Sequence, residues 1–172
     1  VYGDAGRGLV TPLKMAGTNE PRDYALKGID GVWVSSKLMK RPWATRMGFT
    51  GVSATPMSGK GVIEVSTLSR NDTPQLFDRI VLFHSAQPEI EPSVPFVADA
   101  VNGDSLMSVV TLPKPVSIIG LDIELPAEEA VYGMSLEREI PGGLLYHVIG
   151  NNGAAYTSYN GIDLSLIHIS EP

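Results

Sequence analysis

The chain has 172 residues, a formal net charge of −6 and no cysteine. The lack of cysteine excludes a disulfide scaffold, a thiolate zinc site and a cysteine nucleophile in this sequence. Hydrophobic residues make up 43% of the chain, which is ordinary for a protein that buries a core, and no apolar run approaches the roughly 20 residues of a membrane-spanning helix.

The N-terminal segment Gly3-Asp-Ala-Gly-Arg-Gly8 is rich in glycine, but its spacing differs from that of a nucleotide-binding loop. Such a loop follows a strand and opens a helix, whereas Leu9-Val-Thr-Pro12 favours a strand or a turn. Ser58-Gly-Lys-Gly61 lacks the first glycine and the final Ser or Thr of a phosphate-binding P-loop. We therefore expect no cofactor, and we place a hairpin turn at residues 58–61.

Four cations surround one aromatic side chain near residue 40, and these five residues form the candidate ligand-binding patch: Trp43, Lys40, Arg41, Arg46 and Lys37. Pro42 excludes a regular central strand in this segment. Cations beside an exposed aromatic ring bind an anionic polysaccharide, a stacked sugar or a nucleic-acid strand. The acidic balance of the whole chain argues against nucleic acid, which leaves surface glycan as the ligand class.

A second interpretation of this patch stays open. Tryptophan is mostly buried in small β proteins, and Lys and Arg commonly protect sheet edges against aggregation. If Trp43 is exposed instead, the aromatic residues that extend its binding platform are Trp33, Tyr24, Tyr156 and Tyr159.

Two segments alternate in polarity with the period of two that is typical of a strand with one buried face. In residues 62–68 the apolar face consists of Ile63, Val65 and Thr67. In residues 118–125 it consists of Ile119, Leu121, Ile123 and Leu125. Both segments are therefore predicted to be strands on the core.

Ile80–Phe83 and Leu144–Ile149 are more continuously apolar and are predicted to be central strands. His84 and His147 end or lie within these runs, so we expect hydrogen-bonded core or sheet histidines rather than metal ligands. The sequence contains no Gly-x-Ser-x-Gly elbow, so a Ser-His-Asp triad is unsupported.

The sequence Asn102-Gly103 is typical of a tight hairpin with positive φ angles, so Phe96–Val101 and Leu106–Leu112 are predicted to pair antiparallel. Residues 99–104 also place oxygen ligands around this turn, but their spacing differs from that of the EF-hand loop. We expect a plain hairpin and no metal. Helix signals are limited to single turns at Thr73–Phe77 and Pro126–Ala130.

Glu137 and Glu139 lie two residues apart, as do Asp122 and Glu124. On a strand each pair points to one face with a separation of roughly 7 Å, and glycosidases use carboxylates at such separations. Mutual repulsion is weaker on a solvated face, so we expect each pair to lie on a solvated face of its strand. No catalytic residue is assigned.

Charge is divided unevenly along the chain. Up to Ala86, eleven Lys and Arg residues accompany seven Asp and Glu residues, whereas from Gln87 to Asp163 two accompany eleven. The two halves attract each other within one fold or between stacked copies, unless acidic loops simply gather in the second half. Gln87–Pro95 contains three prolines and is either a loop within one domain, residues 1–163, or a linker between two small β domains, residues 1–86 and 96–163. We favour one domain, because each half alone would have a marginal core.

Closely spaced turn signals predict an all-β antiparallel β-sandwich of jelly-roll or Ig-like type, with roughly eight to ten short strands and little helix. The absence of a catalytic motif favours a non-enzymatic module of a virion, such as a phage tail or baseplate, or of a cell-surface assembly. Such a module is extracellular or part of a virion, and it self-associates, packs against other structural subunits or contacts surface glycan. The alternative is a carbohydrate-binding or accessory β domain of a secreted glycan-active enzyme.

The last nine residues, Leu164 to Pro172, match the translation of a transposase-type sequencing adapter, Leu-Ser-Leu-Ile-His-Ile-Ser-Glu-Pro. The chain also opens on Val1 rather than Met. We therefore expect residues 1–163 to be a gene fragment truncated at both ends and residues 164–172 to be a non-native tail. His168 and Glu171 are accordingly not candidate site residues.

Overall fold

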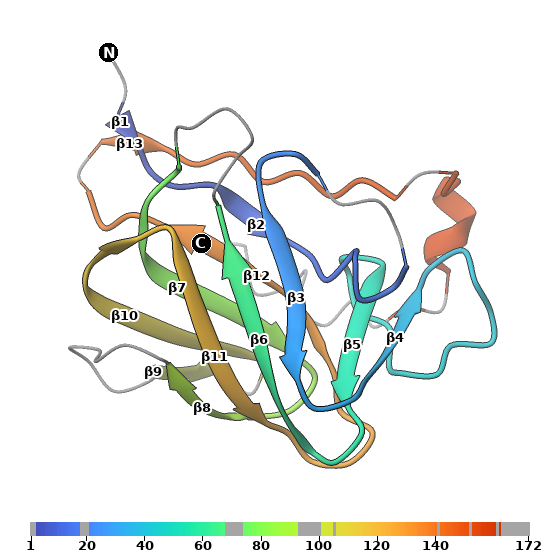
Figure 1. Cartoon of the computed structure of the whole chain (residues 1–172). Coiled ribbons are helices and arrows are strands. Elements are labelled where there is room, and N and C mark those ends of the chain that lie inside the picture. The colour runs from blue at the N-terminus through green and yellow to red at the C-terminus, as the bar shows by residue number, and fades with distance from the viewer. Residues whose placement is uncertain are drawn as a thin grey trace.

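The computed structural model of the chain describes residues 3–17, 21–67, 74–92, 101–104, 106–140, 142–151, 153–160 and 162. Their strands form two main antiparallel sheets that pack face to face (Figure 1). The predicted all-β antiparallel sandwich is confirmed, and eleven strands make up the two sheets. The predicted non-native tail, residues 164–172, lies outside the described residues.

The larger sheet contains seven strands. Six of them lie side by side in the order β4 (Trp33–Lys37), β5 (Val52–Pro56), β12 (Val131–Glu137), β7 (Phe77–His84), β10 (Met107–Val116) and β9 (Val101–Asp104). The seventh, β2 (Gly8–Val10), also pairs antiparallel with β12. Strands β12 and β7 therefore lie at the centre of the sheet.

The smaller sheet contains four strands in the order β3 (Ala25–Asp30), β6 (Lys60–Ser66), β11 (Ile118–Glu124) and β8 (Glu89–Pro92). Strand β8 is part of the proline-rich segment Gln87–Pro95. It lies at the sheet edge, where proline is tolerated because its missing N–H is not needed by a second neighbour. Each sheet takes strands from both sides of this segment.

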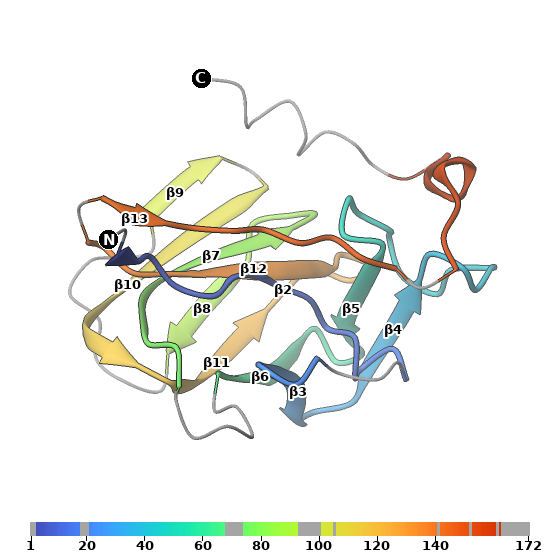
Figure 2. The same ribbon diagram turned by 90° about the horizontal axis from the view of Figure 1, so that it is seen from above.

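A short parallel pair, β1 (Gly3–Asp4) and β13 (Gly143–Leu144), lies outside the two main sheets. From β13 the chain follows an extended path to a single 3-10 turn, η1 (Tyr156–Tyr159), as Figure 2 shows. On the way it passes close to Gly8 and reaches Thr50, whose carbonyl accepts a hydrogen bond from Asn151 Nδ2 at 2.9 Å.

The core lies between the two sheets and confirms both alternating patterns. Ile63 and Val65 of β6 and Leu121 and Ile123 of β11 are fully buried. They belong to one cluster with apolar side chains of the larger sheet, including Ile80, Leu82, Met134 and Leu136. Alternating apolar residues thus supply the smaller sheet's inner face, as the period of two predicts.

The predicted central strand at Ile80–Phe83 is also confirmed, because β7 lies between β12 and β10. His84 ends this strand and is fully buried. Its Nε2 lies 2.9 Å from Ser108 Oγ on β10. His84 is therefore a hydrogen-bonded core residue, as predicted.

The second predicted central strand, Leu144–Ile149, is wrong. Only Leu144 of this run belongs to a strand, β13, and Leu144, Tyr146 and Val148 are 69%, 74% and 51% exposed. A continuously apolar run usually signals burial on both faces, but the described part of the chain leaves most of these side chains uncovered. His147 is exposed too, so its predicted place within an apolar strand is wrong.

The predicted hairpin is present but its turn is shifted. Strands β9 and β10 pair antiparallel, with Asp104 opposite Met107 and Asn102 opposite Ser108. The chain therefore reverses between Asp104 and Met107, and Asn102-Gly103 forms part of β9. Residues 96–100, and with them the predicted oxygen cluster beginning at Asp99, lie outside the described residues.

Turns take the place of the other predicted local elements. Pro126–Ala130 holds a turn in which Glu129 N donates to Pro126 O at 3.2 Å, not a helix. The described part of Thr73–Phe77 leads straight into β7. Residues 57–59 turn as expected, with Gly59 N bonded to Pro56 O at 3.0 Å, but this turn joins β5 to β6 in the opposite sheet and is not a hairpin.

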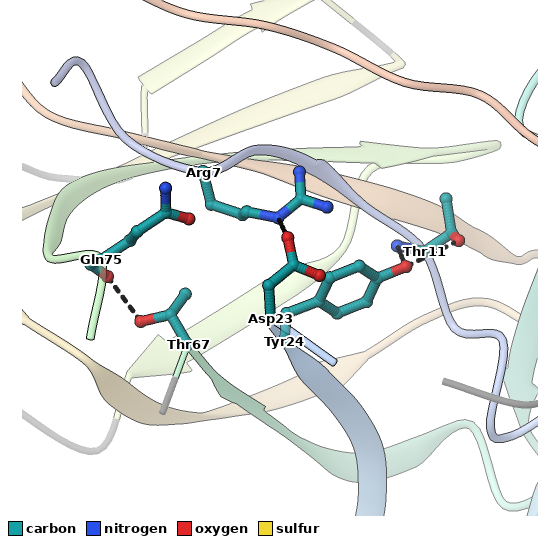
Figure 3. Close-up of polar contacts among 6 residues, drawn as sticks. All are labelled: Arg7, Thr11, Asp23, Tyr24, Thr67 and Gln75. Carbon is teal, nitrogen blue, oxygen red and sulfur yellow. Dashed lines mark hydrogen bonds and ion pairs between the residues drawn. The ribbon is translucent and has the colours of Figure 1, made fainter. Parts of the chain in front are cut away.

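The two sheets are tied together where β2 ends and β3 begins (Figure 3). The Tyr24 hydroxyl accepts a hydrogen bond from Thr11 N at 3.3 Å, and Arg7 Cζ lies 5.1 Å from the centre of the Tyr24 ring. Arg7 Nε also pairs with Asp23. The Arg7 side chain is only 15% exposed and Tyr24 only 6%. We call Arg7, Thr11, Asp23 and Tyr24 the edge clasp.

Opposite charges from the two halves of the sequence meet within the fold. Lys60 Nζ lies 3.8 Å from Asp122 Oδ2, and Arg46 Nη1 lies 3.5 Å from Glu129 Oε2. Each pair joins a cation of the first half to an acid of the second. Part of the charge asymmetry is therefore neutralised inside one molecule.

The acidic pair Glu137 and Glu139 does not share one solvated face. Glu137 ends β12, is 17% exposed and pairs with Arg79 of the neighbouring strand β7. Glu139 lies beyond the strand and is exposed. The solvated-face interpretation is wrong for Glu137, because a cross-strand cation accompanies it.

Candidate ligand-binding groove

The loop of residues 38–51, here called the Trp43 loop, connects β4 to β5 at one edge of the larger sheet. Its backbone closes at the base, where Leu38 N donates to Gly51 O at 2.8 Å. The peptide bond between Arg41 and Pro42 in its first half is cis. The loop thus connects two antiparallel strands and is not itself a strand. This agrees with the expectation that Pro42 excludes a regular central strand here.

Buried hydroxyl groups hold the Trp43 loop against the sheet. Thr45 N donates to Ser36 Oγ at 2.9 Å, and Thr45 Oγ1 lies 2.7 Å from Ser53 Oγ. Further along, Thr50 Oγ1 donates to the carbonyl of Tyr132 on β12 at 2.7 Å. Buried polar groups are costly when unpaired, so these bonds favour one position of the loop.

Trp43 packs against a second apolar cluster, whose buried members are Leu38, Met47 and Ile162. Its indole Nε1 donates to Leu38 O at 3.3 Å. The indole is half-buried, since part of it belongs to this cluster and part lines a cavity at the surface. Each of the two interpretations of the sequence therefore describes part of Trp43, because one part of the indole is buried and another is exposed.

Arg41 lies over the ring of Trp43. Its Cζ is 4.4 Å from the ring centre, and its Nη2 donates to Asn160 O at 2.9 Å. A cation over an aromatic ring contributes about 0.5–1 kcal/mol at an exposed site. Arg41 thus helps to orient the indole and links the Trp43 loop to the chain that follows η1.

A cavity of about 820 Å³ lies beside the Trp43 loop and is lined by Trp43, Ala44, Thr45, Arg46, Met47, Glu128, Glu129 and Ile162. A second cavity of about 540 Å³ shares Ala44, Thr45 and Glu128 with the first, and its other walls include Val34, Thr55, Pro56 and Met57. We call the two together the Trp43 groove. Their volumes lie within the range of known small-ligand sites, about 300–1,000 Å³.

Two adjacent carboxylates of the groove differ in their surroundings. Glu129 Oε2 accepts a hydrogen bond from Ser85 Oγ and lies 3.5 Å from Arg46 Nη1. Glu128 has a φ of 70°, and its carboxylate forms no hydrogen bond or ion pair with another residue that the structure describes. Both residues belong to the turn between β11 and β12.

The five predicted patch residues are only partly brought together. Trp43 and Arg46 line the first cavity, and Arg41 lies against Trp43. Lys37 belongs to β4 and Lys40 is exposed, and neither lines the two cavities of the groove. The described lining of the groove therefore contains one guanidinium and two carboxylates rather than a ring of cations.

Of the four residues predicted to extend the aromatic platform, Tyr24 and Trp33 lie away from Trp43. Tyr24 belongs to the edge clasp and to the core. Trp33 packs over Gly28 and Gly61 of the smaller sheet, where a Cβ atom would lie 2.4 Å and 2.9 Å from the indole. Tyr159 packs in the same cluster as Trp43, whereas the Tyr156 side chain is not described.

Glu128 and Glu129 line the groove but do not belong to the predicted patch. They lie more than 80 positions after Trp43 in the printed sequence, and only the sandwich brings them together. The available signal is Pro126-Ala-Glu-Glu129, a turn sequence that carries an acid where glycine is the usual residue. Recognising it requires knowing that this turn faces the Trp43 loop.

Within the described ranges, no group of three or more His, Cys, Asp or Glu side chains is placed to hold a metal ion. Nor does any helix in this part of the chain have the length and apolar character needed to cross a bilayer. The described residues that line the groove offer indole, hydroxyl, guanidinium and carboxylate groups.

No family model matches the sequence, and no curated protein matches it. A solved structure of a peptidoglycan O-acetylesterase is similar, with a TM-score of 0.57 and 19% sequence identity. The likeness covers 91% of this chain and 41% of that chain. The chain thus shares its fold with part of a longer protein, and it spans less than half of that protein's length. The predicted virion or cell-surface role stays a prediction.

Proposed function

We propose that the chain is a carbohydrate-binding accessory domain of a glycan-active enzyme and that glycan binds in the Trp43 groove. The observation that carries the proposal is the groove itself, where a loop and a turn of the β-sandwich bring together a half-buried tryptophan, hydroxyl groups and carboxylates. The similar fold found within a peptidoglycan O-acetylesterase supports the enzyme class. A function on peptidoglycan would require a location outside the cytoplasm.

The lining of the groove suits the two kinds of surface that a sugar presents. The C–H groups of a pyranose ring pack on an aromatic face, and Trp43 offers the part of its indole that the apolar cluster leaves uncovered. Sugar hydroxyl groups need donors and acceptors, which Arg46, Glu128 and Ser58 supply along the walls. Ligand sites typically combine apolar walls with a few such polar groups.

The position of the two carboxylates favours binding over glycoside hydrolysis. Glycosidases use two carboxyl groups on opposite sides of the bond that is cleaved. Glu128 and Glu129 are instead neighbours in one turn, and Glu129 is already engaged by Ser85 and Arg46. A glycan bound in the groove would therefore not have these two carboxylates on opposite sides of a glycosidic bond.

Calorimetric titration with a tetramer of β-1,4-linked N-acetylglucosamine, and with soluble glycan strands of peptidoglycan, tests this function. The chain is expected to bind at least one of them. Ala44→Leu places a larger apolar side chain on the wall common to both cavities, where Ala44 is exposed. It should weaken binding about tenfold or more by occupying the space of the ligand.

Tyr146→Ala is the matched control, because Tyr146 is an exposed aromatic residue that does not line the groove. It should bind like the parent chain. Failure of the parent to bind any of these glycans, or equal binding by Ala44→Leu and the parent, would overturn the proposed function.

A further inference from the structure

Glu128 is a groove residue with an unusual backbone conformation and a carboxylate that no described residue neutralises. Its φ of 70° is the positive value of a left-handed residue, and no other non-glycine residue in the described ranges has one. Glu129 N donates to Pro126 O across the turn, which makes Glu128 the third of four turn residues. Glycine is usual at this place when φ is positive.

The left-handed conformation has a cost that the side chain does not recover within the domain. A non-glycine residue held in such a conformation costs on the order of 1 kcal/mol or more. The carboxylate of Glu128 makes no contact with a cation or a hydrogen-bond donor of another described residue. The turn is therefore expected to be more stable with glycine, and no contact among the described residues offsets the cost of the glutamate.

The place of Glu128 is where a ligand would meet it. Glu128 lies in the wall common to the two cavities, together with Ala44 and Thr45. An oligosaccharide that occupies both cavities would pass directly beside this carboxylate. The wall of the second cavity also contains Thr55, whose Oγ1 is buried without a hydrogen-bond partner among the described residues.

The charges of the groove point to a cation as the missing partner of Glu128. Among the described residues, Arg46 is the one cationic side chain that lines either cavity, and it lies beside Glu129. Glu128, by contrast, has no cationic partner among the described lining residues. Hydrogen bonds between ionised partners are roughly twice as strong as neutral ones, so a protonated amine is a better complement than a hydroxyl group.

We infer that Glu128 recognises a protonated amino group of the bound oligosaccharide, so that the groove prefers amino sugars with free amines. This inference rests on the proposed function, because it assumes that glycan occupies the groove. N-acetylation removes the positive charge and leaves only neutral hydrogen bonds to Glu128. A polyuronic acid would bring like charges together at the centre of the groove and would bind worst.

Calorimetry with three probes of equal length tests the preference: the tetramers of β-1,4-linked glucosamine, β-1,4-linked N-acetylglucosamine and α-1,4-linked galacturonic acid. The parent chain should bind the glucosamine tetramer about five- to tenfold more tightly than the N-acetylated one. Added salt should reduce this ratio, because a charged contact at an exposed carboxylate is screened. Galacturonic acid should bind more weakly than both.

Glu128→Gln removes the charge and keeps the side-chain shape, so it should bring the glucosamine preference close to one and leave affinity for the N-acetylated tetramer nearly unchanged. Glu128→Gly should lose the preference as well, with a melting temperature at or above that of the parent because glycine relieves the turn. Glu124→Gln is the matched control. Glu124 is an exposed glutamate of β11 outside the groove, and its removal changes the net charge equally.

The outcomes separate this inference from the proposed function. If the parent binds none of the glycans, the proposed function fails and takes the inference with it. If the parent binds the N-acetylated tetramer but shows no preference for free amines, or keeps that preference in Glu128→Gln, only the inference is overturned. An equal loss of preference in Glu124→Gln also overturns it, because the effect would then be one of net charge.

Discussion

Two regions of this sandwich use the same pair of groups, an arginine over an aromatic ring, in opposite surroundings. In the edge clasp, Arg7 lies over Tyr24 and both side chains are largely buried. At the groove, Arg41 lies over Trp43 at a shorter distance, 4.4 Å against 5.1 Å, but Arg41 is exposed and Trp43 is only half-buried. The shorter distance therefore does not identify the pair that contributes more to the stability of the fold.

Burial decides what each pair does. The clasp joins β2 to β3 across the two sheets, and the Tyr24 hydroxyl adds a hydrogen bond to Thr11. The groove pair joins two surface segments and leaves part of the indole facing a cavity. The clasp is therefore expected to stabilise the fold, whereas the groove pair is expected to position a binding surface.

The largest loss of stability is expected for Tyr24→Ala. The substitution removes a ring that is 6% exposed and leaves a cavity between the sheets, at a cost of about 3–4 kcal/mol in the free energy of unfolding. Urea denaturation followed by tryptophan fluorescence measures the change. A loss below about 1 kcal/mol would show that the clasp is not part of the core.

A smaller loss is expected for Arg7→Met, which keeps much of the aliphatic packing but removes the guanidinium. Its ion pair with Asp23 and its position over Tyr24 are lost, but Asp23 is 47% exposed and stays solvated. We expect a loss of about 1–2 kcal/mol, measured by the same denaturation. Equal stability of variant and parent would contradict the assignment of Arg7 to the clasp.

Arg41→Ala should cost less again, about 0.5 kcal/mol, because an exposed cation over a ring contributes little. Its effect is expected in glycan binding, where a less restrained indole should weaken affinity severalfold. Urea denaturation measures the change in stability, and calorimetric titration measures the change in glycan affinity. A loss of stability as large as that of Arg7→Met would remove the contrast between clasp and groove.

The smallest effect is expected for the double substitution Tyr146→Ser and Val148→Ser. Both side chains are more than half exposed, so the melting temperature should change little. The variant should also bind less of a hydrophobic dye, because it lacks two exposed apolar side chains. A clear fall in melting temperature would show that this apolar run packs on the domain after all.

Local sequence patterns predict part of this structure, and each exception has a physical reason. Alternation in residues 62–68 and 118–125 predicts strands because one covered face leaves a period of two, and the structure confirms both. Leu144–Ile149 has the composition of a buried strand but is mostly exposed. Composition shows that a segment is apolar, but it does not show whether another element packs on it. Asn102-Gly103 fits a tight turn, but register with β10 places it inside β9.

Local sequence patterns also predict only part of the groove. Trp43 and Arg46 stand out locally as an aromatic residue and a cation close together. Glu128 and Glu129 enter the site only through the packing of a distant turn against the Trp43 loop. The cation-rich segment predicts surface glycan as the ligand, but it does not predict that the described lining of the groove carries two carboxylates and one guanidinium.

Amide chemical-shift mapping tests the central claim most directly, because it reports on both regions at once. The 15N-labelled chain would be titrated with the tetramer of β-1,4-linked N-acetylglucosamine and with soluble peptidoglycan glycan strands. Binding in the Trp43 groove predicts saturable shifts at Ala44, Thr45 and Glu128, with Thr11 and Tyr24 of the edge clasp unchanged. Shifts confined to the clasp, or no shifts with either glycan, would contradict the account.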